Sequence, residues 1–334
     1  MGSSVGVVPA AGTGGVRVQS ETPVLGLDIG GTKLAAGVVD GNGIVHSFVV
    51  APSRADEGPE PTLARLFELG RQSVTESGLE WSAIEAVGIG CGGPLDAERG
   101  ILIAPPHLPG WRNVHVGELA EQAYRRPATL ENDATAAAAG EHRWGAGAGI
   151  SNMVYLTIST GVGGGVVIDG SLYRGSMGNG GELGHVTVDW HGRRCRGCGR
   201  LGCLEAYVSG TSIAERAQEA GLPFSTAEEV AAAARAGDAG AKALWDETVE
   251  ALACGVTSIV NLFEPELVVI GGGVSRSGEQ LIGPVRELVR ASTMKPAGEK
   301  ADIVASAFGD HVGVVGAAAI VYDRAALGEL RPNG

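Results

Sequence analysis

Basic residues are scarce in this 334-residue chain, which has 25 Lys and Arg against 38 Asp and Glu and a formal net charge of −13. Binding to nucleic acid depends on clustered Lys and Arg, so this balance argues against nucleic acid as a partner. It does not exclude phosphorylated small molecules, which backbone N–H groups and a metal ion can hold locally.

Long apolar runs are also absent. No stretch approaches the roughly 18–20 residues that span a bilayer, so we expect no membrane association. The start of the chain has neither a basic segment nor a compact apolar core, unlike a signal peptide. We therefore expect a flexible leader over residues 1–22 and a cytoplasmic protein.

Cysteine is rare, with five residues in the whole chain, too few for a disulfide framework in a protein of this length. Cys195, Cys198 and Cys203 lie within nine positions, whereas Cys91 and Cys254 are isolated in apolar surroundings. This distribution favours a cytosolic protein with one metal site.

Glycine, in contrast, is abundant, with 55 residues. Without a collagen period, these glycines are expected in turns where the backbone approaches something closely. The length predicts two domains of about 100–200 residues each, and strands that alternate with helices predict an α/β fold with a largely buried sheet. Strands are expected over residues 25–29, 33–40, 44–50, 86–90, 128–130, 152–158, 166–169 and 267–270, and helices over 62–77, 116–124, 133–144, 241–263 and 312–327.

The pattern of the first half restarts near residue 152. Residues 38–41 (Val-Val-Asp-Gly) are similar to residues 167–170 (Val-Ile-Asp-Gly), and each follows a strand, a glycine-rich turn and a second strand. We interpret this as a weak internal duplication, although Val-rich strands that end in Asp-Gly also arise by chance.

Three glycine turns are predicted at the carboxyl ends of strands, over residues 28–33, 159–165 and 271–273. Glycine lets the backbone present its N–H groups to an anion, and ligands of α/β folds collect at this edge. The chain has no Walker A motif, and the first turn leads into a strand, whereas a Rossmann fingerprint opens a helix. Each turn alone fits a tight hairpin equally well, but the three together favour a phosphate site. Asp28 is then an outer-shell partner for Mg²⁺ or the cap of its turn.

With these turns, the chain resembles the ROK family of sugar kinases and repressors, within the actin/hexokinase-like ATPase superfamily, from residue 24 to about residue 327. The resemblance implies two ribonuclease-H-like lobes that close over ATP and a sugar in the cleft between them. Residues 23–133, joined by the C-terminal helix 313–328, would form a small lobe, and residues 134–312 a large lobe. The implied nucleotide-binding residues are Asp28, Gly30, Gly31, Thr32, Lys33, Thr160, Gly161, Gly163, Gly271, Gly272 and Gly273.

Glu131-Asn132-Asp133 directly precedes the Ala-rich helix. Asp133 fits the N-cap of that helix, and it also fits a general base that accepts the proton of a hydroxyl attacking a γ-phosphate. We favour the base, and the two roles are compatible. The Asn132-Asp133 pair is similar to the Asn-Asp pair of the family, in which the Asp is the base.

Further motifs, Gly181 to His185 and Gly202 to Glu205, match the sugar side of the family pattern. The implied sugar-binding residues are Gly93, Asn132, Asp133, Glu182, His185 and Glu205. The chain departs from the pattern in having Cys-Gly-Gly-Pro over residues 91–94 in place of Ala-Pro-Gly-Pro, and His107 in place of an Asn before Leu-Pro-Gly-Trp. We expect His107 to replace a sugar contact, although a solvated loop position is an alternative, and the identity of the sugar stays open.

His185, Cys195, Cys198 and Cys203 form a Cys₃His set of the kind that binds structural zinc. The family has one residue between its first two cysteines, whereas this chain has two, so ligation by Cys195 is the open point. Ligation through one nitrogen of His185 leaves the other for the sugar, which couples the metal to the substrate site.

The sequence therefore predicts an ATP-dependent kinase that converts glucose to glucose 6-phosphate, with Mg²⁺ as cofactor and a structural Zn²⁺. The alternatives are an N-acetylmannosamine or N-acetylglucosamine kinase and a non-catalytic sugar-sensing protein, and polyphosphate is an alternative donor. The leader is too short and Gly-rich for the helix-turn-helix domain of the family's repressors. A homo-oligomer, either a dimer or a tetramer, is expected.

Overall fold

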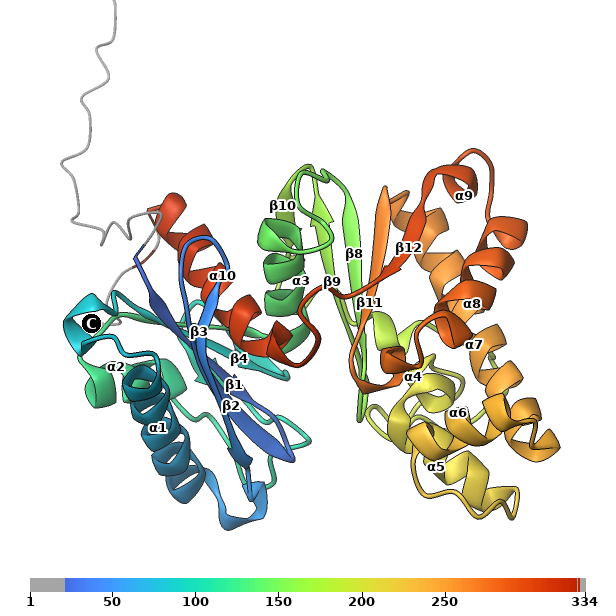
Figure 1. Cartoon of the computed structure of the whole chain (residues 1–334), viewed down its shortest axis with the longest axis horizontal. Helices are drawn as coiled ribbons and strands as arrows, with labels where there is room; N and C mark the ends of the chain where they lie inside the picture. The colour runs from blue at the N-terminus through green and yellow to red at the C-terminus, as the bar shows by residue number, and fades with distance from the viewer. Residues whose placement is uncertain (1–21, 329, 331–334) are drawn as a thin grey trace, which may run out of the picture.

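The computed structural model describes residues 22–328 and residue 330, so the expected leader lies outside the described residues except for Thr22. Two five-stranded sheets stand side by side with two helices between them (Figure 1). We call the half that contains the N-terminal sheet the small lobe and the other half the large lobe. Among the described residues, no helix has both the length and the apolar character needed to cross a membrane.

The two sheets repeat one topology, with strand order β3-β2-β1-β4-β7 in the small lobe and β10-β9-β8-β11-β12 in the large lobe. In each sheet a three-stranded antiparallel meander is extended by two parallel strands. Residues 38–41 and 167–170 lie at the equivalent hairpin of the two sheets, which agrees with the expected duplication. The strands are β1 (Val24–Ile29), β2 (Lys33–Val39), β3 (Val45–Pro52), β4 (Val87–Cys91), β7 (Ala128–Asn132), β8 (Met153–Ile158), β9 (Val162–Ile168), β10 (Ser171–Tyr173), β11 (Leu267–Gly271) and β12 (Asp302–Ala305), with β5 (Leu95–Asp96) and β6 (Ile101–Leu102) as a separate small hairpin.

The helices cover both faces of each sheet (Figure 1). In the small lobe, α1 and α2 pack on the outer side and α10 packs on the inner side. In the large lobe, α3 packs on the inner side and the other helices lie outside. Their bounds are α1 (Pro59–Glu76), α2 (Val116–Tyr124), α3 (Asp133–Trp144), α4 (Glu205–Val208), α5 (Gly210–Glu219), α6 (Ala227–Ala236), α7 (Ala239–Phe263), α8 (Glu279–Ser292), α9 (Ala297–Lys300) and α10 (Val312–Ala326).

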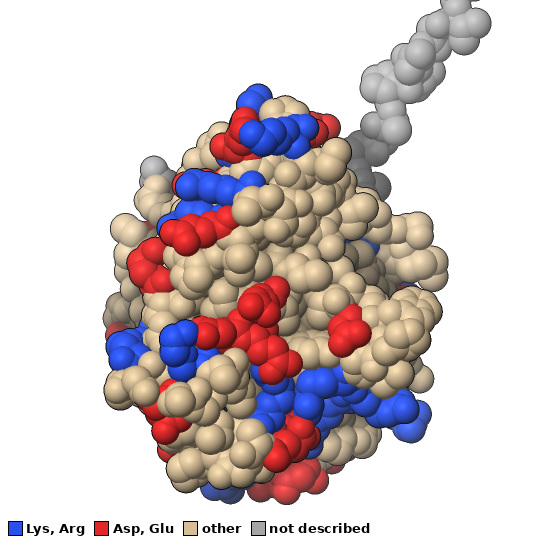
Figure 2. Space-filling model, turned by 90° about the vertical axis from the view of Figure 1, so that its right-hand side faces the viewer, with Lys and Arg blue, Asp and Glu red and all other residues tan. Residues whose placement is uncertain are grey.

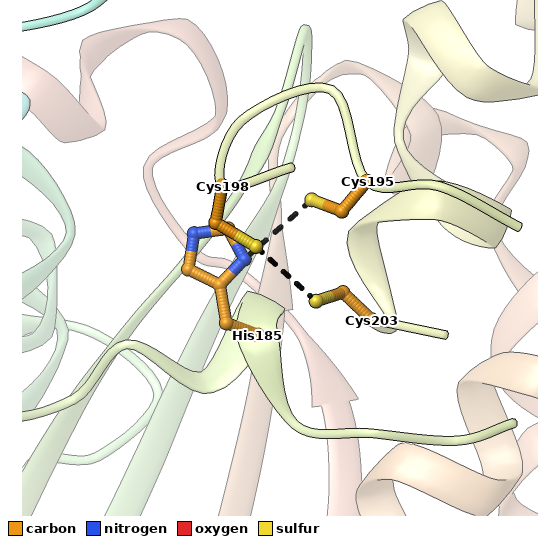
Figure 3. Close-up of side chains that lie close together, drawn as sticks. All are labelled: His185, Cys195, Cys198 and Cys203. Atoms are coloured by element: carbon orange, nitrogen blue, oxygen red, sulfur yellow. Dashed lines mark hydrogen bonds between the residues drawn. The ribbon is translucent and has the colours of Figure 1, made fainter. Parts of the chain in front are cut away.

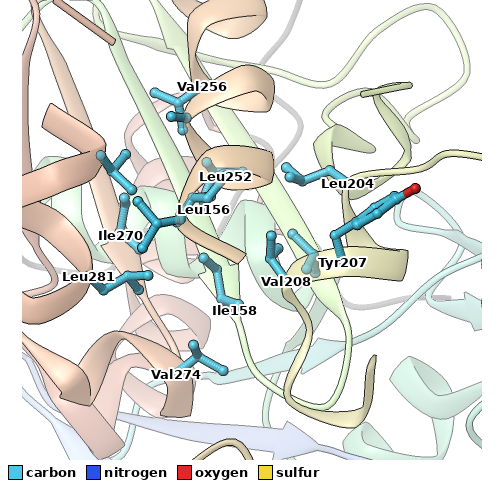
Figure 4. Close-up of a cluster of buried hydrophobic side chains, with 14 of the residues drawn as sticks. Leu156, Ile158, Leu204, Tyr207, Val208, Leu252, Val256, Ile270, Val274 and Leu281 are labelled. Atoms are coloured by element: carbon cyan, nitrogen blue, oxygen red, sulfur yellow. The ribbon is translucent and has the colours of Figure 1, made fainter. Parts of the chain in front are cut away.

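The large-lobe core lies between its sheet and the outer helices. Leu156 of β8 and Ile270 of β11 pack in one cluster with Leu252 and Val256 of α7 (Figure 4). All four side chains are fully buried, and burying each one contributes about 1.5–3 kcal/mol. This packing fixes the carboxyl ends of β8 and β11, from which two of the glycine segments emerge.

At the outer end of the large lobe, basic and acidic side chains lie next to each other (Figure 2). In and beside α8 and α9, Arg286 pairs with Glu279 at 3.3 Å and Lys295 pairs with Glu299 at 2.6 Å. Exposed pairs of this kind contribute about 0–1 kcal/mol each. The stability of the lobe therefore comes from its core.

More than half of the described glycines lie in turns and loops, as predicted, but several lie within strands. Gly26 on β1 and Gly88 on β4 have no space for a side chain because backbone carbonyl groups of α10 occupy it. On β9, a Cβ atom on Gly163 would lie 2.8 Å from the Cβ atom of Ala134 on α3. All three glycines lie against a helix, although Gly163 is predicted from the sequence to approach a nucleotide.

The two central helices meet through small residues. Ala136 and Ala139 of α3 form a buried cluster with Ala319 of α10. A Cβ atom on Gly140 of α3 would lie 3.1 Å from the backbone of Gly316 on α10. The helix surfaces in contact are therefore nearly flat.

Candidate active site and cysteine cluster

We call the junction between β7 and α3 the catalytic corner, because the sequence predicts the general base there. The cap of the helix is Asn132, whose Oδ1 accepts hydrogen bonds from the backbone N–H groups of Ala134 at 3.0 Å and Thr135 at 3.1 Å. Asp133 is the first helical residue, and its Oδ1 accepts from Ala134 N–H at 2.8 Å. The N-cap interpretation of Asp133 is thus wrong. Its carboxylate stands at the positive end of the helix dipole, which favours negative charge.

Asp28 and Asp133 are two half-buried acidic residues that influence each other electrostatically. Burial raises the pKa of Asp133, while the charge of His107 acts in the opposite direction. Burial and then repulsion from Asp133 raise the pKa of Asp28 to about 7, against the attraction of Lys33. Two carboxyl groups that resist ionising together are stabilised by a nearby cation, and carboxylate oxygens are ligands that Mg²⁺ accepts. The donor set at Asp28 therefore fits a magnesium ion.

The first glycine segment lies between β1 and β2, and Thr32 and Lys33 are exposed at its end. A Cβ atom on Gly30 would lie 2.9 Å from the carbonyl oxygen of Lys33, and one on Gly31 would lie 2.9 Å from the carbonyl oxygen of His107. The turn is therefore closed tightly on itself and against the loop that carries His107.

His107 brings the two departures from the family pattern into contact. Its Nε2 lies 4.0 Å from the Sγ atom of Cys91, and a Cβ atom on Gly92 would lie 2.5 Å from its Cε1. The ring is half-buried, and burial lowers its pKa against the attraction of Asp133. Glycine at position 92 thus makes room for an imidazole at position 107.

The second glycine segment is shorter than expected. The turn occupies residues 159–161, with Thr160 exposed, and β9 begins at Val162, so Gly163 lies inside a strand. The glycine run looks like a long turn in the sequence, but its members leave space for α3 on one face and for Leu183 on the other. Thr160 and Gly161 remain at the carboxyl end of β8, as predicted.

The third glycine segment begins at Gly271, the last residue of β11. Gly272 has a φ of +86°, and its missing side chain leaves room for the backbone of Ile158. Gly273 starts a 3₁₀ turn that leads into α8. Because β8 and β11 are paired in parallel, the second and third segments emerge at the same edge of the large-lobe sheet.

A hollow separates the catalytic corner from the loop before His185. It is lined by Asn132, Gly163, Gly164 and residues 179–182. Gly93 borders the same region, since a Cβ atom there would lie 3.8 Å from Nδ2 of Asn132. Burial raises the pKa of Glu182, and the negative charges of Asp133 and Glu205 raise it further. The charge of His185 acts in the opposite direction. Asn132, Asp133, Glu182 and Gly93, all predicted to face the sugar, are thus brought together.

The donor atoms of His185, Cys195, Cys198 and Cys203 lie within 4.8 Å of one another (Figure 3). The Nδ1 atom of His185 is 3.7 Å from the Sγ atom of Cys195, and the Sγ atoms of Cys198 and Cys203 are 3.4 Å apart. Tetrahedral zinc with bonds of about 2.3 Å to sulfur holds its ligands about 3.8 Å apart. The four residues fit a zinc ion, and Cys195 fits despite the longer loop. The second nitrogen of His185, Nε2, lies 4.0 Å from Glu182.

Glu205 joins the cysteine cluster to the second glycine segment. One carboxylate oxygen, Oε2, accepts a hydrogen bond from Val162 N–H at 2.9 Å, and the other lies 3.3 Å from the Sγ atom of Cys195. Glu205 is also the first residue of α4. A disturbance of the cysteine loop is therefore passed directly to the start of β9.

Two residues at the site had no role in the sequence analysis. Arg174 pairs with Glu131 at 2.7 Å, and Oδ1 of Asn179 would lie 3.6 Å from a Cβ atom on Gly93. Both belong to the glycine-rich stretch that precedes Glu182, and this composition is the one feature of the sequence that could have indicated them. Their partners are distant in the sequence, so the spacing of nearby residues does not reveal these contacts.

The comparisons with known proteins agree with this geometry. The ROK family model matches residues 24–324. The chain is 38% identical to a glucokinase of Thermotoga maritima over 318 residues, which cover 90% of this chain and 98% of that protein. A ROK hexokinase structure from Thermus thermophilus is 38% identical, with a TM-score of 0.74 and coverage of 89% of this chain and 97% of the other. A ROK family glucokinase from Streptomyces griseus, in complex with glucose and AMPPNP, is 33% identical, with a TM-score of 0.75 and coverage of 89% and 98%. The chain therefore belongs to the ROK family and has the actin/hexokinase-like ATPase fold.

Proposed function

We propose that this protein is an ATP-dependent hexose kinase that phosphorylates the 6-hydroxyl of glucose. The observation that carries the proposal is the position of Asp133. It is electrostatically coupled to Asp28 of the first glycine segment, the helix it begins packs on Gly163, and it adjoins the hollow lined by Asn132 and Glu182. A base for phosphoryl transfer has to stand between donor and acceptor. The glucose and AMPPNP bound to the related Streptomyces griseus enzyme support this pair of ligands.

In the proposed mechanism, Asp133 accepts the proton of the sugar hydroxyl and orients its oxygen toward the γ-phosphoryl group. Asn132 uses its Oδ1 in the helix cap, so its Nδ2 is the group that holds a neighbouring hydroxyl. Glu182, Glu205 and Nε2 of His185 bind further sugar hydroxyls. Backbone N–H groups of the glycine segments bind the phosphates. Asp28 would hold a magnesium ion, which would supply charge neutralisation on the phosphates.

The cysteine cluster is proposed to hold one structural zinc ion. Closed sites of four Cys and His ligands act by fixing the fold around them. The metal would bind both His185 and Cys203. Because Glu182 lies just before His185 and Glu205 just after Cys203, the metal would hold the segments that carry these two glutamates together. Reduced thiols of this kind fit a cytoplasmic protein.

We also propose that two lobes close over the ligands. The small lobe comprises residues 23–133 with 313–328, and the large lobe comprises residues 134–312.

A dimer or tetramer is proposed because large apolar side chains are exposed on the large lobe, among them Trp190 (76% exposed) and Leu262 (72% exposed). Sedimentation velocity distinguishes these states from a monomer. No nucleic acid or membrane is proposed as a partner.

The test is an ADP-release assay with glucose, mannose, N-acetylglucosamine and N-acetylmannosamine, each with ATP or polyphosphate as donor. We expect the highest kcat/KM with glucose and ATP. A higher value for either N-acetylhexosamine would make the protein an N-acetylhexosamine kinase. Sugar binding by calorimetry without turnover of any sugar would identify a sugar-sensing protein and overturn the proposed activity.

A further inference from the structure

An ion pair between Glu131 and Arg174 connects the two lobes beside the catalytic corner. Glu131 lies on β7, two residues before Asp133, and its side chain is 1% exposed. Its Oε2 accepts a hydrogen bond from Nε of Arg174 at 2.7 Å, and its Oε1 accepts one from the backbone N–H of Asn132 at 3.0 Å. One buried carboxylate therefore holds both the residue that caps α3 and a side chain from the other lobe.

At the other end of the pair, Arg174 closes a small loop. It follows β10, the edge strand of the large-lobe sheet, and its carbonyl oxygen accepts a hydrogen bond from Gly180 N–H at 2.8 Å. A Cβ atom on Gly180 would lie 2.9 Å from the carbonyl carbon of Arg174. Residues 174–180 thus form a closed loop, and residues 179–182, at and just after the end of that loop, line the hollow together with Asn132. The position of Arg174 sets the position of that lining.

We propose that Glu131 and Arg174 are positioning residues, which hold the sugar-facing loop 179–182 at a fixed distance from Asn132 and Asp133. The inference rests on the proposed sugar kinase activity. A buried ion pair adds little net stability compared with apolar residues of the same size. Such a pair instead fixes the relative orientation of the two segments that it joins, because the N–H groups of the planar guanidinium donate hydrogen bonds in fixed directions. Reacting groups misplaced by about 1 Å lose on the order of a hundredfold in rate.

The experiment compares Arg174→Gln, which removes the charge and the fixed donor, with Arg174→Lys, which keeps the charge on a flexible stem. For Arg174→Gln we expect kcat/KM for glucose to fall about ten- to a hundredfold, partly through a raised KM for glucose, with less than about a threefold change in the KM for ATP. Arg174→Lys should recover part of the loss. Arg286→Gln is the matched control, because Arg286 is an arginine of similar exposure that pairs with Glu279 at 3.3 Å at the outer end of the large lobe, outside the residues that line the hollow.

Arg174→Gln leaves a buried carboxylate without its partner, which destabilises proteins. The double variant Glu131→Gln with Arg174→Gln removes both charges, so that no buried charge is left without a partner. We expect it to melt near the wild-type temperature and still to show the raised KM for glucose. Wild-type kinetics in the double variant would overturn the proposal, as would equal losses for glucose and ATP in every variant.

Hydrogen–deuterium exchange gives a readout that needs no turnover. Peptides covering residues 175–182 should exchange faster in the double variant than in wild-type protein, whereas the Arg286→Gln control should match wild type. Unchanged exchange would overturn the positioning role even if the wild-type enzyme phosphorylated none of the sugars tested. An inactive wild-type enzyme with faster exchange in the variant would overturn the proposed activity and leave the positioning role standing.

Discussion

Asp133→Asn separates the chemistry of the site from its structure, because the change keeps the shape of the side chain. The Oδ1 atom of Asp133 accepts from Ala134 N–H at 2.8 Å, and an asparagine amide oxygen can accept the same bond. The first turn of α3 should therefore persist. What is lost is the ability to accept a proton.

The expected size of the effect follows from general base catalysis, which contributes about 10²- to 10⁴-fold. At 1.36 kcal/mol for each factor of ten, this is a barrier increase of about 3 to 5 kcal/mol. Sugar affinity should stay within about tenfold of wild type, because the loss acts on kcat. Coupled ADP release measures the rate, and calorimetry measures the binding of glucose.

The pH profile provides a second readout. Burial raises the pKa of Asp133 above its usual range, so kcat of the wild-type enzyme should fall as the pH drops through that raised value, where the carboxyl group becomes protonated. The Asn variant should lack this inflection. Removing the charge should also lower the pKa of Asp28 from about 7, because repulsion from Asp133 contributes to it.

Asp169→Asn is the control for this series. Asp169 lies at the exposed hairpin after β9 with a φ of +50°, a conformation that asparagine adopts readily. It should keep wild-type kcat and the wild-type pH profile. Turnover at the wild-type rate in Asp133→Asn, with Asp169→Asn unchanged, would refute the assignment of Asp133 as the base.

Three further changes test the other parts of the site. Gly30→Val should weaken ATP far more than glucose, because its Cβ would lie 2.9 Å from the carbonyl oxygen of Lys33, and unchanged nucleotide affinity by calorimetry would contradict this. Cys203→Ser should lose about one zinc ion per chain and about 10- to 100-fold in sugar affinity, with a smaller loss for ATP passed on through Glu205. A variant that retains its zinc by elemental analysis would exclude Cys203 as a ligand. His107→Asn should change the ratio of glucose to N-acetylmannosamine turnover, and an identical ratio would remove His107 from the sugar contacts.

Local sequence carried most of what could be predicted. The hairpins after residues 40 and 169 and the strand before Asp133 depend on neighbouring residues, and the structure has them as expected. The Cys₃His donors lie within 19 positions, from His185 to Cys203, so one loop can bring them together. These features follow from spacing alone.

Features that depend on distant partners were not predictable in the same way. The glycines of β9 were interpreted as a turn, because nothing nearby indicates that α3 will pack on Gly163. Glu131 and Arg174 are 43 positions apart, as are Val162 and Glu205. Such pairs form only when the fold brings two strands or loops together, and a single sequence contains no mark of that event.

The flat contact between α3 and α10 has a mechanical consequence. Alanine and glycine surfaces lack the ridges that lock helices in register, and domains joined by packed helices move by small sliding steps, or shear. α10 packs on the small-lobe sheet, and α3 packs mainly on the large-lobe sheet but continues directly from β7 of the small lobe. We infer that lobe closure moves α3 against α10 about the junction of α3 with β7. Small-angle scattering with and without glucose would detect the closure, and an unchanged radius of gyration would count against it. Since Asp133 lies at that junction, the proposed base would stay nearly in place during closure, and the sugar-facing loop of the large lobe would be brought toward it.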